Sequence, residues 1–196
     1  MKTLKVGITG GIGSGKTTVC KIFEVLNIPV YYSDERAKWL MNNNLTLKNE
    51  ICDLFSSDAY FENGELNRSF LAKIIFEDDT KRTLLNNLIH PKVMEDGENW
   101  FKTIDGKFSY ALKESAILFE SGAYLWADKV ITVSAFEKIR INRVQKRDFA
   151  DLHSVIRRIL SQWSDEQREA KSDFVIQNNG TQLLIPQIID IHKMLI

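Results

Sequence analysis

Short apolar runs alternate with segments of helical periodicity along most of this chain. Five mostly apolar runs predict buried strands, at residues 5–9, 28–32, 110–119, 129–134 and 174–177. Helical patterns occur at 16–26, at 137–148 and from about residue 182, where Thr181 is a plausible helix cap. Strands that alternate with helices pair in parallel through right-handed crossovers. The pattern therefore predicts an α/β fold with a five-stranded parallel sheet.

Residues 35–104 lie between the second and third predicted strands and show no convincing strand pattern. Helical patterns recur in this segment, at 37–41, 47–55, 70–76, 84–89 and 93–104. Asn63-Gly64 marks a turn, and His90-Pro91 is expected at a break between two helices. We expect one domain over 1–196, with 35–104 as a helical insertion. The insertion is a natural place for a substrate-binding flap, and it could equally be a passive thickening of the fold.

The segment between the first strand and the first helix reads G-x-x-x-x-G-K-[ST]. A backbone that curls round a polyphosphate points several N–H groups inward, and glycine reaches the necessary dihedral angles without a Cβ clash. The alternative is a flexible Gly/Ser loop before a lysine, but the flanking strand and helix favour a phosphate loop. Lys16 would meet the β- and γ-phosphates and the Thr17 hydroxyl would bind Mg²⁺. The residues expected to hold ATP here are Gly10, Gly11, Gly13, Ser14, Gly15, Lys16, Thr17 and Thr18.

Two further features point to the same edge of the sheet. Ligands of open parallel sheets lie beyond the carboxyl ends of the strands, so Asp34, just after the second strand, is expected near the phosphates. Its structural alternative is an N-cap for the next helix. Arg140, Arg143 and Arg147 share one face of the helix at 137–148. Such a charged face is usually solvated, but it could also form a lid, at about 137–165, whose arginines neutralise a transferring phosphoryl group.

Charge, cysteine content and the absence of long apolar segments indicate which partners and which compartment to expect. Lysine plus arginine and aspartate plus glutamate both number 26, so no net charge attracts the chain to nucleic acid or to an anionic membrane. Cys20 and Cys52 are too few for a disulfide framework and are expected to be free thiols. Neither a signal peptide nor a membrane span is expected, which places the protein in the cytoplasm. The sequence predicts nothing about the oligomeric state.

Taken together, these residues resemble those of the dephospho-coenzyme A kinase family over essentially the whole chain. The matching positions are Thr9 to Lys16, Asp34 with Ala37, Gly64 to Arg68 with Leu71 and Phe76, His90-Pro91, Leu118 to Glu120, Arg143 with Arg147-Asp148, Gln162, and Asp173 to Gly180. Two positions depart from the family pattern. Tyr32 stands where a second aspartate is usual, which leaves Asp34 as the single candidate carboxylate at that strand end. Ala116 stands where proline is usual, which bears on local backbone shape.

The resemblance implies a three-layer P-loop fold with a helical substrate-binding insertion and a small lid. It implies transfer of the ATP γ-phosphoryl group to the ribose 3′-hydroxyl of dephospho-coenzyme A, with Mg²⁺ as cofactor. In this scheme Lys16, Asp34 and Arg143 are catalytic, and Asp34 orients the acceptor hydroxyl and takes its proton. The remaining expected contacts are Arg140 and Arg147 with the phosphates, Asn178, Asn179 and Gly180 with the adenine edge, Arg68 and His90 with the substrate, and Glu120, as the end of a core strand, with Mg²⁺-bound water.

The nearest alternative is another small-metabolite or nucleoside-monophosphate kinase with the same core. A nucleotide-dependent switch is a more distant one. GTPase switches usually show D-x-x-G and N-K-x-D after the glycine loop, and neither motif occurs in this sequence.

Overall fold

The computed structural model describes residues 2–196, which divide into two compact units. One unit holds the chain up to Tyr32 together with Phe101–Ile196, and the other holds Ser33–Trp100. The second unit covers nearly the same residues as the predicted insertion at 35–104. In the described part of the chain, no helix has the length and apolar character needed to cross a membrane.

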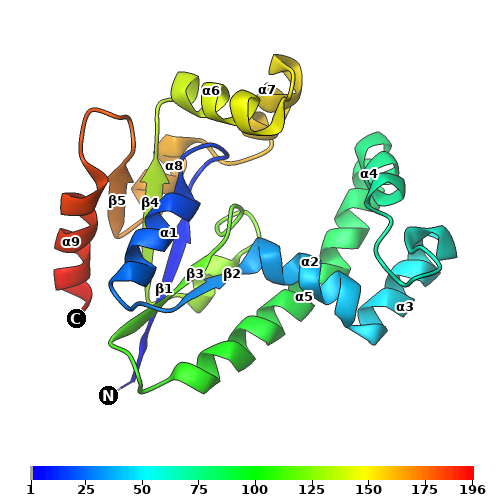
Figure 1. The fold of residues 1–196 in the computed structure, drawn as a ribbon, viewed down its shortest axis with the longest axis horizontal. Coiled ribbons are helices and arrows are strands. Elements are labelled where there is room, and N and C mark those ends of the chain that lie inside the picture. The colour runs from blue at the N-terminus through cyan, green and yellow to red at the C-terminus, as the bar shows by residue number, and fades with distance from the viewer. Residues whose placement is uncertain (1) are drawn as a thin grey trace. The chain divides into compact units, whose positions relative to one another are not determined.

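The first unit is built on a five-stranded parallel sheet with the strand order β2-β3-β1-β4-β5, as Figure 1 shows. Its strands are β1 (Leu4–Thr9), β2 (Val30–Tyr32), β3 (Tyr110–Glu114), β4 (Lys129–Ser134) and β5 (Phe174–Gln177). The central strands β3 and β1 are buried along almost their whole length, because helices cover both faces of a parallel sheet. The predicted α/β fold and parallel sheet are confirmed.

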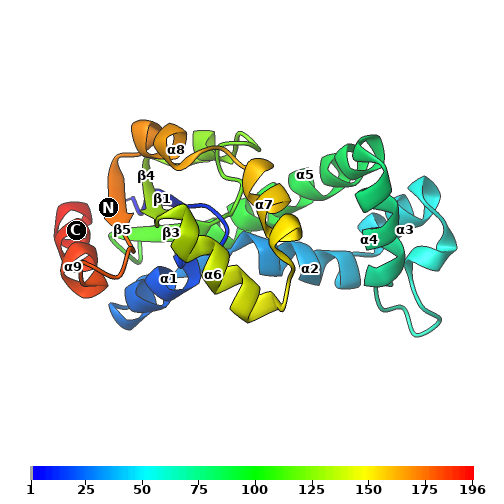
Figure 2. The same ribbon diagram turned by 90° about the horizontal axis from the view of Figure 1, so that it is seen from above.

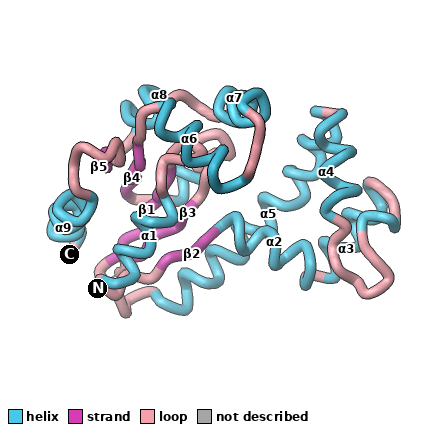
Figure 3. The backbone as a smooth tube through the Cα atoms, turned by 45° about the horizontal axis from the view of Figure 1, so that its top comes forward, coloured by secondary structure: helices cyan, strands magenta, loops and turns pink. Residues whose placement is uncertain are grey.

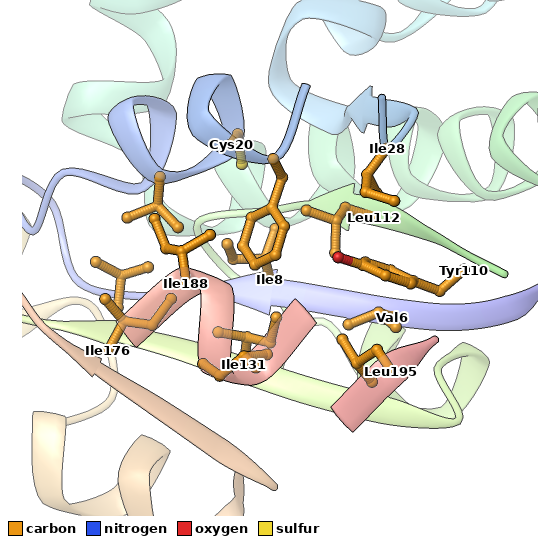
Figure 4. Packing of buried hydrophobic residues seen from close by; sticks show 14 residues of the cluster. Val6, Ile8, Cys20, Ile28, Tyr110, Leu112, Ile131, Ile176, Ile188 and Leu195 are labelled. Carbon is orange, nitrogen blue, oxygen red and sulfur yellow. The ribbon is translucent and has the colours of Figure 1, made fainter. Parts of the chain in front are cut away.

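Helices on both faces make three layers. Figure 2 shows α1 (Lys16–Val25) and α9 (Leu184–Leu195) on one side of the sheet and α8 (Asp165–Lys171) on the other. The main core lies under α1 and α9, where Ile8 and Ile131 of the sheet pack with Ile188, as Figure 4 shows. Each such fully buried aliphatic side chain contributes about 1.5–3 kcal/mol of transfer free energy. This core holds β1, and hence the loop that follows it, in a fixed place.

Helices α6 (Glu137–Asp148) and α7 (Leu152–Leu160) follow β4 and lie side by side (Figure 3). Val144, Val155 and Ile159 form a small core of their own, and Ile12 of the glycine loop packs against it. The region predicted as a lid therefore shares apolar contacts with the phosphate loop itself.

The second unit consists of α2 (Ser33–Asn43), α3 (Leu45–Leu54), the short 3₁₀ helix η1 (Ser57–Ala59), α4 (Arg68–Glu77) and most of α5 (Asp79–Ile104). The predicted break at His90-Pro91 is wrong, because α5 runs through it. Proline removes one helical hydrogen bond. Leu85, Ile89 and Val93 recur every four residues and are all buried, so packing on both sides of Pro91 keeps one helix.

In the first unit two predicted element ends are wrong, while the other predicted strands and helices end within two residues of their predicted bounds. β3 ends at Glu114 instead of residue 119, and a turn leads to the 3₁₀ helix η2 (Ala123–Trp126). Leu118, one of the apolar residues after Glu114, is buried without belonging to a strand, because it fills the space beside Gly7. A Cβ at Gly7 would lie 2.7 Å from Leu118 Cδ2. Thr181 is not the cap of α9, because the N-cap is Leu183, whose carbonyl accepts a hydrogen bond from Gln187 Nε2.

Candidate active site

The glycine loop joins β1 to α1 and has the backbone of an anion site. Gly10, Gly13 and Gly15 have φ values of 152°, 80° and 97°, which side-chain-bearing residues rarely adopt. Gly15 is the N-cap of α1 and has no side chain to cap the helix. The first amides of α1 thus remain open to a ligand at the positive end of the helix dipole.

Close packing supplies a second reason for glycine in this loop. A Cβ at Gly11 would lie 2.4 Å from the guanidinium carbon of Arg140, and one at Gly13 would lie 2.6 Å from the Arg140 carbonyl oxygen. A Cβ at Gly15 would lie 2.2 Å from Asn178 Nδ2. The glycines therefore allow α6 and the segment after β5 to press against the loop.

Lys16 is buried, and its ammonium group donates a hydrogen bond to the Gly10 carbonyl at 2.8 Å. Burial raises the pKa of the Cys20 thiol, the Glu114 carboxylate raises it further, and Lys16 opposes both effects. Cys20 lies in the second turn of α1, and the charges of both Lys16 and Glu114 act on its thiol. Glu114 is the last residue of β3 and pairs in register with Ile8 of β1.

Arg143 and Asn178 hold the inner part of the loop. Arg143 Nη1 donates to the carbonyls of Gly13 at 3.3 Å and Ser14 at 3.2 Å, and its Nη2 donates to the Asn178 carbonyl at 3.0 Å. Asn178 Nδ2 donates to the Ser14 carbonyl at 2.7 Å. Arg143 and Asn178, 35 positions apart in sequence, thus meet at the loop, and Arg143 is bound to loop carbonyls, which differs from the mobile lid arginine that the sequence predicts.

The side chains of Arg140 and Arg147 do not lie where the sequence predicts them, as mobile lid residues over the phosphates. Arg140 is only 3% exposed, donates from Nε to the Ile12 carbonyl at 3.1 Å, and is ion-paired with Asp165. Arg147 is exposed and ion-paired with Asp148 at 2.7 Å. Asp148 also accepts from Arg158 of α7 at 2.8 Å, and both arginines hold the pKa of Asp148 well below its usual range. Asp148 thus pairs α6 with α7 through Arg158, and Arg147 holds the same carboxylate from within α6.

Glu120 differs from its prediction as well, because it lies in a turn and not at a strand end. Its Oε1 accepts from the Trp163 backbone N–H at 2.8 Å and lies 4.0 Å from Arg168 Nη2. Arg168 is fully buried and also pairs with Asp165 at 2.8 Å. In this structure Glu120 anchors the chain at residue 163.

Asn179 and Gly180 follow Asn178 after β5. Asn179 Oδ1 accepts from the Phe136 backbone N–H at 2.6 Å, which ties this segment to the start of α6. Gly180 has a φ of 80°, and a Cβ there would meet nothing within 4 Å. The space beside Gly180 is therefore open.

The remaining predicted residues belong to the second unit. Asp34 is exposed in the first turn of α2, which starts at Ser33, so it favours the helix dipole without being the N-cap. Burial lowers the pKa of His90 on α5, and the Asp34 carboxylate acts in the opposite direction. Arg68 is exposed at the start of α4. Arg36, two residues after Asp34, makes a two-pronged ion pair with Asp96 of α5 at 2.8 and 2.7 Å. This pair fixes the start of α2 against α5.

Comparison with known proteins decides the family. The family model for dephospho-CoA kinase matches residues 4–183. A curated dephospho-CoA kinase from Bacteroides fragilis is 39% identical over 188 residues, which span 96% of this chain and 91% of the relative. One from Porphyromonas gingivalis is 40% identical over 189 residues, spanning 96% of this chain and 92% of the relative. This chain belongs to the dephospho-CoA kinase family.

Solved structures agree on the fold of this dephospho-CoA kinase family member. The crystal structure of TT1252 from Thermus thermophilus matches with a TM-score of 0.86 at 25% identity, over 99% of this chain and 98% of the other. A dephospho-CoA kinase from Campylobacter jejuni matches with a TM-score of 0.71 at 24% identity, over 96% and 95% of the two chains.

Two polar residues near the phosphate loop, Glu114 and Gln162, were not among the predicted site residues. Glu114 lay in the middle of the strand predicted at 110–119, whereas it is the last residue of β3. The available signal was the pair of charged residues Lys113 and Glu114 inside the predicted strand at 110–119, but only the structure shows that this strand lies next to β1. Gln162 carried only a family match, and its contact with Ile12 spans 150 positions, which no local pattern encodes.

Proposed function

We propose that this protein transfers the γ-phosphoryl group of ATP to the ribose 3′-hydroxyl of dephospho-coenzyme A, giving coenzyme A and ADP. The observation that carries the proposal is the family match over residues 4–183, which includes a fully formed phosphate loop. Two free cysteines and a balanced charge suit an enzyme that works in the cytoplasm with these soluble substrates.

ATP would bind with its phosphates in the glycine loop. The amides of Gly13 and of residues 15–18 would surround the β-phosphate, whereas the Ser14 N–H donates to the Gly11 carbonyl at 3.0 Å. Lys16, already at the loop, would exchange its hydrogen bond with the Gly10 carbonyl for bonds with phosphate oxygens. The hydroxyls of Thr9 and Ser14 are buried and find no hydrogen-bond partner among the described residues, which leaves them for a ligand or water. Asn178 to Gly180 would border the adenine, where Gly180 leaves open space.

The residues present fit Mg²⁺. Thr17 is exposed at the start of α1, and Glu114 ends the strand next to β1, the place where P-loop enzymes carry a metal-binding acid. Among the described residues, no group of three or more His, Cys, Asp or Glu side chains forms a metal cage. Thr17 would be the protein ligand of Mg²⁺ and Glu114 the nearby acid, and the bound ion would supply positive charge to the ATP phosphates.

Asp34 is the proposed base for the acceptor hydroxyl. It is exposed and lies two residues after β2, whose carboxyl end faces the same edge of the sheet as the phosphate loop. Phosphoryl transfer passes through a loose transition state, so Asp34 would mainly orient the hydroxyl and take its proton late. His90, whose pKa responds to Asp34, and the exposed Arg68 are the proposed substrate contacts of this unit.

One assay tests the proposal. The protein is incubated with Mg²⁺, ATP and dephospho-coenzyme A, and the product is identified by mass and by ³¹P NMR of the new ribose phosphate. We expect a 3′-phosphate and equimolar ADP, and product formation that is at least about 10²-fold slower with Lys16→Met. Phosphorylation of a nucleoside monophosphate or another small alcohol, with dephospho-coenzyme A left unchanged, would overturn the assignment and favour the alternative kinase.

A further inference from the structure

We propose that Gln162 is a positioning residue for phosphoryl transfer, which fixes the phosphate loop through the backbone of Ile12. The inference rests on the proposed function and deepens it. Gln162 follows α7 and is far from the loop in sequence, and its side chain uses both ends of its amide. Oε1 accepts from the Ile12 N–H at 2.8 Å, and Nε2 donates to the Ala116 carbonyl at 3.1 Å.

Both polar groups of the Ile12 backbone are therefore held by side chains. Gln162 takes the N–H, and Arg140 Nε donates to the carbonyl at 3.1 Å. The Ile12 side chain packs against the small core formed by Val144, Val155 and Ile159. An amide that points at Gln162 cannot also point at a phosphate. Gln162 thus decides which loop amides face the ligand, and it keeps Ile12 out of that set.

Gln162 is itself held in place by its neighbours. The Trp163 backbone N–H donates to Glu120 Oε1 at 2.8 Å, and the Trp163 ring stacks on Phe119 with centroids 5.4 Å apart and an angle of 7° between the planes. Ala116, Phe119 and Glu120 all belong to the segment that follows β3. Gln162 therefore connects the phosphate loop to the segment after the neighbouring strand, which Phe119 and Glu120 hold against Trp163, as a positioning contact requires.

The test compares Gln162→Met with Gln167→Met. Both replace glutamine by an apolar side chain of similar length, and Gln162 borders a cavity of about 570 Å³, so methionine fits. Gln167 belongs to the capping box of α8, where its side chain accepts a hydrogen bond from the Ser164 N–H. Its replacement should destabilise the same segment of the chain while leaving the Gln162 contact with the phosphate loop in place. Affinity for ATP and for inorganic tripolyphosphate is measured by calorimetry, and kcat and KM are measured with dephospho-coenzyme A.

We expect Gln162→Met to weaken ATP and tripolyphosphate equally, by about tenfold, because a loop amide loses its partner. We expect kcat to fall by up to about 10²-fold from the misplaced phosphates. Gln167→Met should lower thermal stability and leave binding and kcat unchanged. Wild-type affinity and kcat in folded Gln162→Met, or the same losses in Gln167→Met, would overturn the inference.

Gln162→Glu provides a second arm if the methionine variant does not fold. Its carboxylate still accepts from Ile12 but repels the Ala116 carbonyl, whereas the protonated acid can donate to that carbonyl. The defect relative to wild type should therefore shrink as the pH falls, and a defect that does not depend on pH would count against positioning. Failure of the proposed function has a different signature: wild type would bind ATP and tripolyphosphate but leave dephospho-coenzyme A unphosphorylated.

Discussion

Asp34→Asn separates the catalytic role of Asp34 from its helical one. The carboxylate lies in the first turn of α2 and is exposed, and the helix begins one residue before it. Its contribution to the helix is therefore a dipole interaction, worth about 0.3–1 kcal/mol, and not a capping hydrogen bond. Asparagine keeps the size and removes the charge, so the free energy of unfolding should fall by less than about 1 kcal/mol.

The effect on catalysis should be much larger. General-base assistance contributes about 10²–10⁴ in rate, and a loose transition state with late proton transfer places the loss near the lower end, about 10². ATP affinity should survive because the glycine loop and Lys16 are unchanged. We would measure kcat with saturating substrates, ATP binding by calorimetry, and unfolding in urea.

Glu35→Gln is the matched control, because Glu35 is also exposed in the first turn of α2. It should show the same small loss of stability with wild-type kcat. The pKa of His90 gives an independent readout: Asp34 raises it, so Asp34→Asn should lower it further, which ¹H NMR can follow. The reasoning is refuted if Asp34→Asn keeps wild-type kcat, or if Glu35→Gln loses as much activity.

The remaining predictions concern three other side chains. Lys16→Met should lower kcat by at least about 10²-fold in a folded protein, as measured in the ADP-release assay, because a positioned charge at the phosphates is lost. Arg143→Ala should lower kcat more than it raises the KM for ATP, because Arg143 holds the Gly13 and Ser14 carbonyls and its loss would misplace the bound phosphates; a change in KM alone would contradict this. His90→Gln should flatten the pH dependence of stability. Burial lowers the pKa of His90, so the unfolded state binds its proton more readily, and stability is lost as the pH falls below 6.5 towards the folded pKa. The free energy of unfolding is measured by urea melts above and below pH 6.5. The same pH dependence in wild type and His90→Gln would contradict this prediction.

Local patterns predicted much of the sheet because each strand is a short buried run bounded by polar or glycine residues. β4 and β5 have the predicted boundaries, Lys129–Ser134 and Phe174–Gln177. The third strand was predicted too long because burial looks the same in sequence whether a residue sits in a sheet or beside one. Leu118 is buried against Gly7 from outside the sheet, a contact between distant segments that periodicity does not report.

Part of the candidate site could likewise be predicted from local sequence patterns, and part could not. The phosphate loop was predictable because its glycines and Lys16 are contiguous and their chemistry is local. The contacts that support the loop are not local: Gln162 reaches Ile12 across 150 positions, and Asn178 reaches Ser14 across 164. A polar residue in a helix or turn has many possible partners, and only the fold selects one of them.

The arginines of α6 show why spacing alone does not assign a role. Arg140, Arg143 and Arg147 share a helix face, yet the first is buried against the loop, the second holds loop carbonyls, and the third is exposed beside Asp148. The helix starts against the phosphate loop and ends in solvent, so each turn meets a different environment. The region at 137–165 is bound to the phosphate loop near both of its ends, by Arg140 and Arg143 of α6 and by Gln162 after α7. Closure over bound phosphates would then be easiest in the part between these ties, where the exposed Phe149 joins α6 to α7.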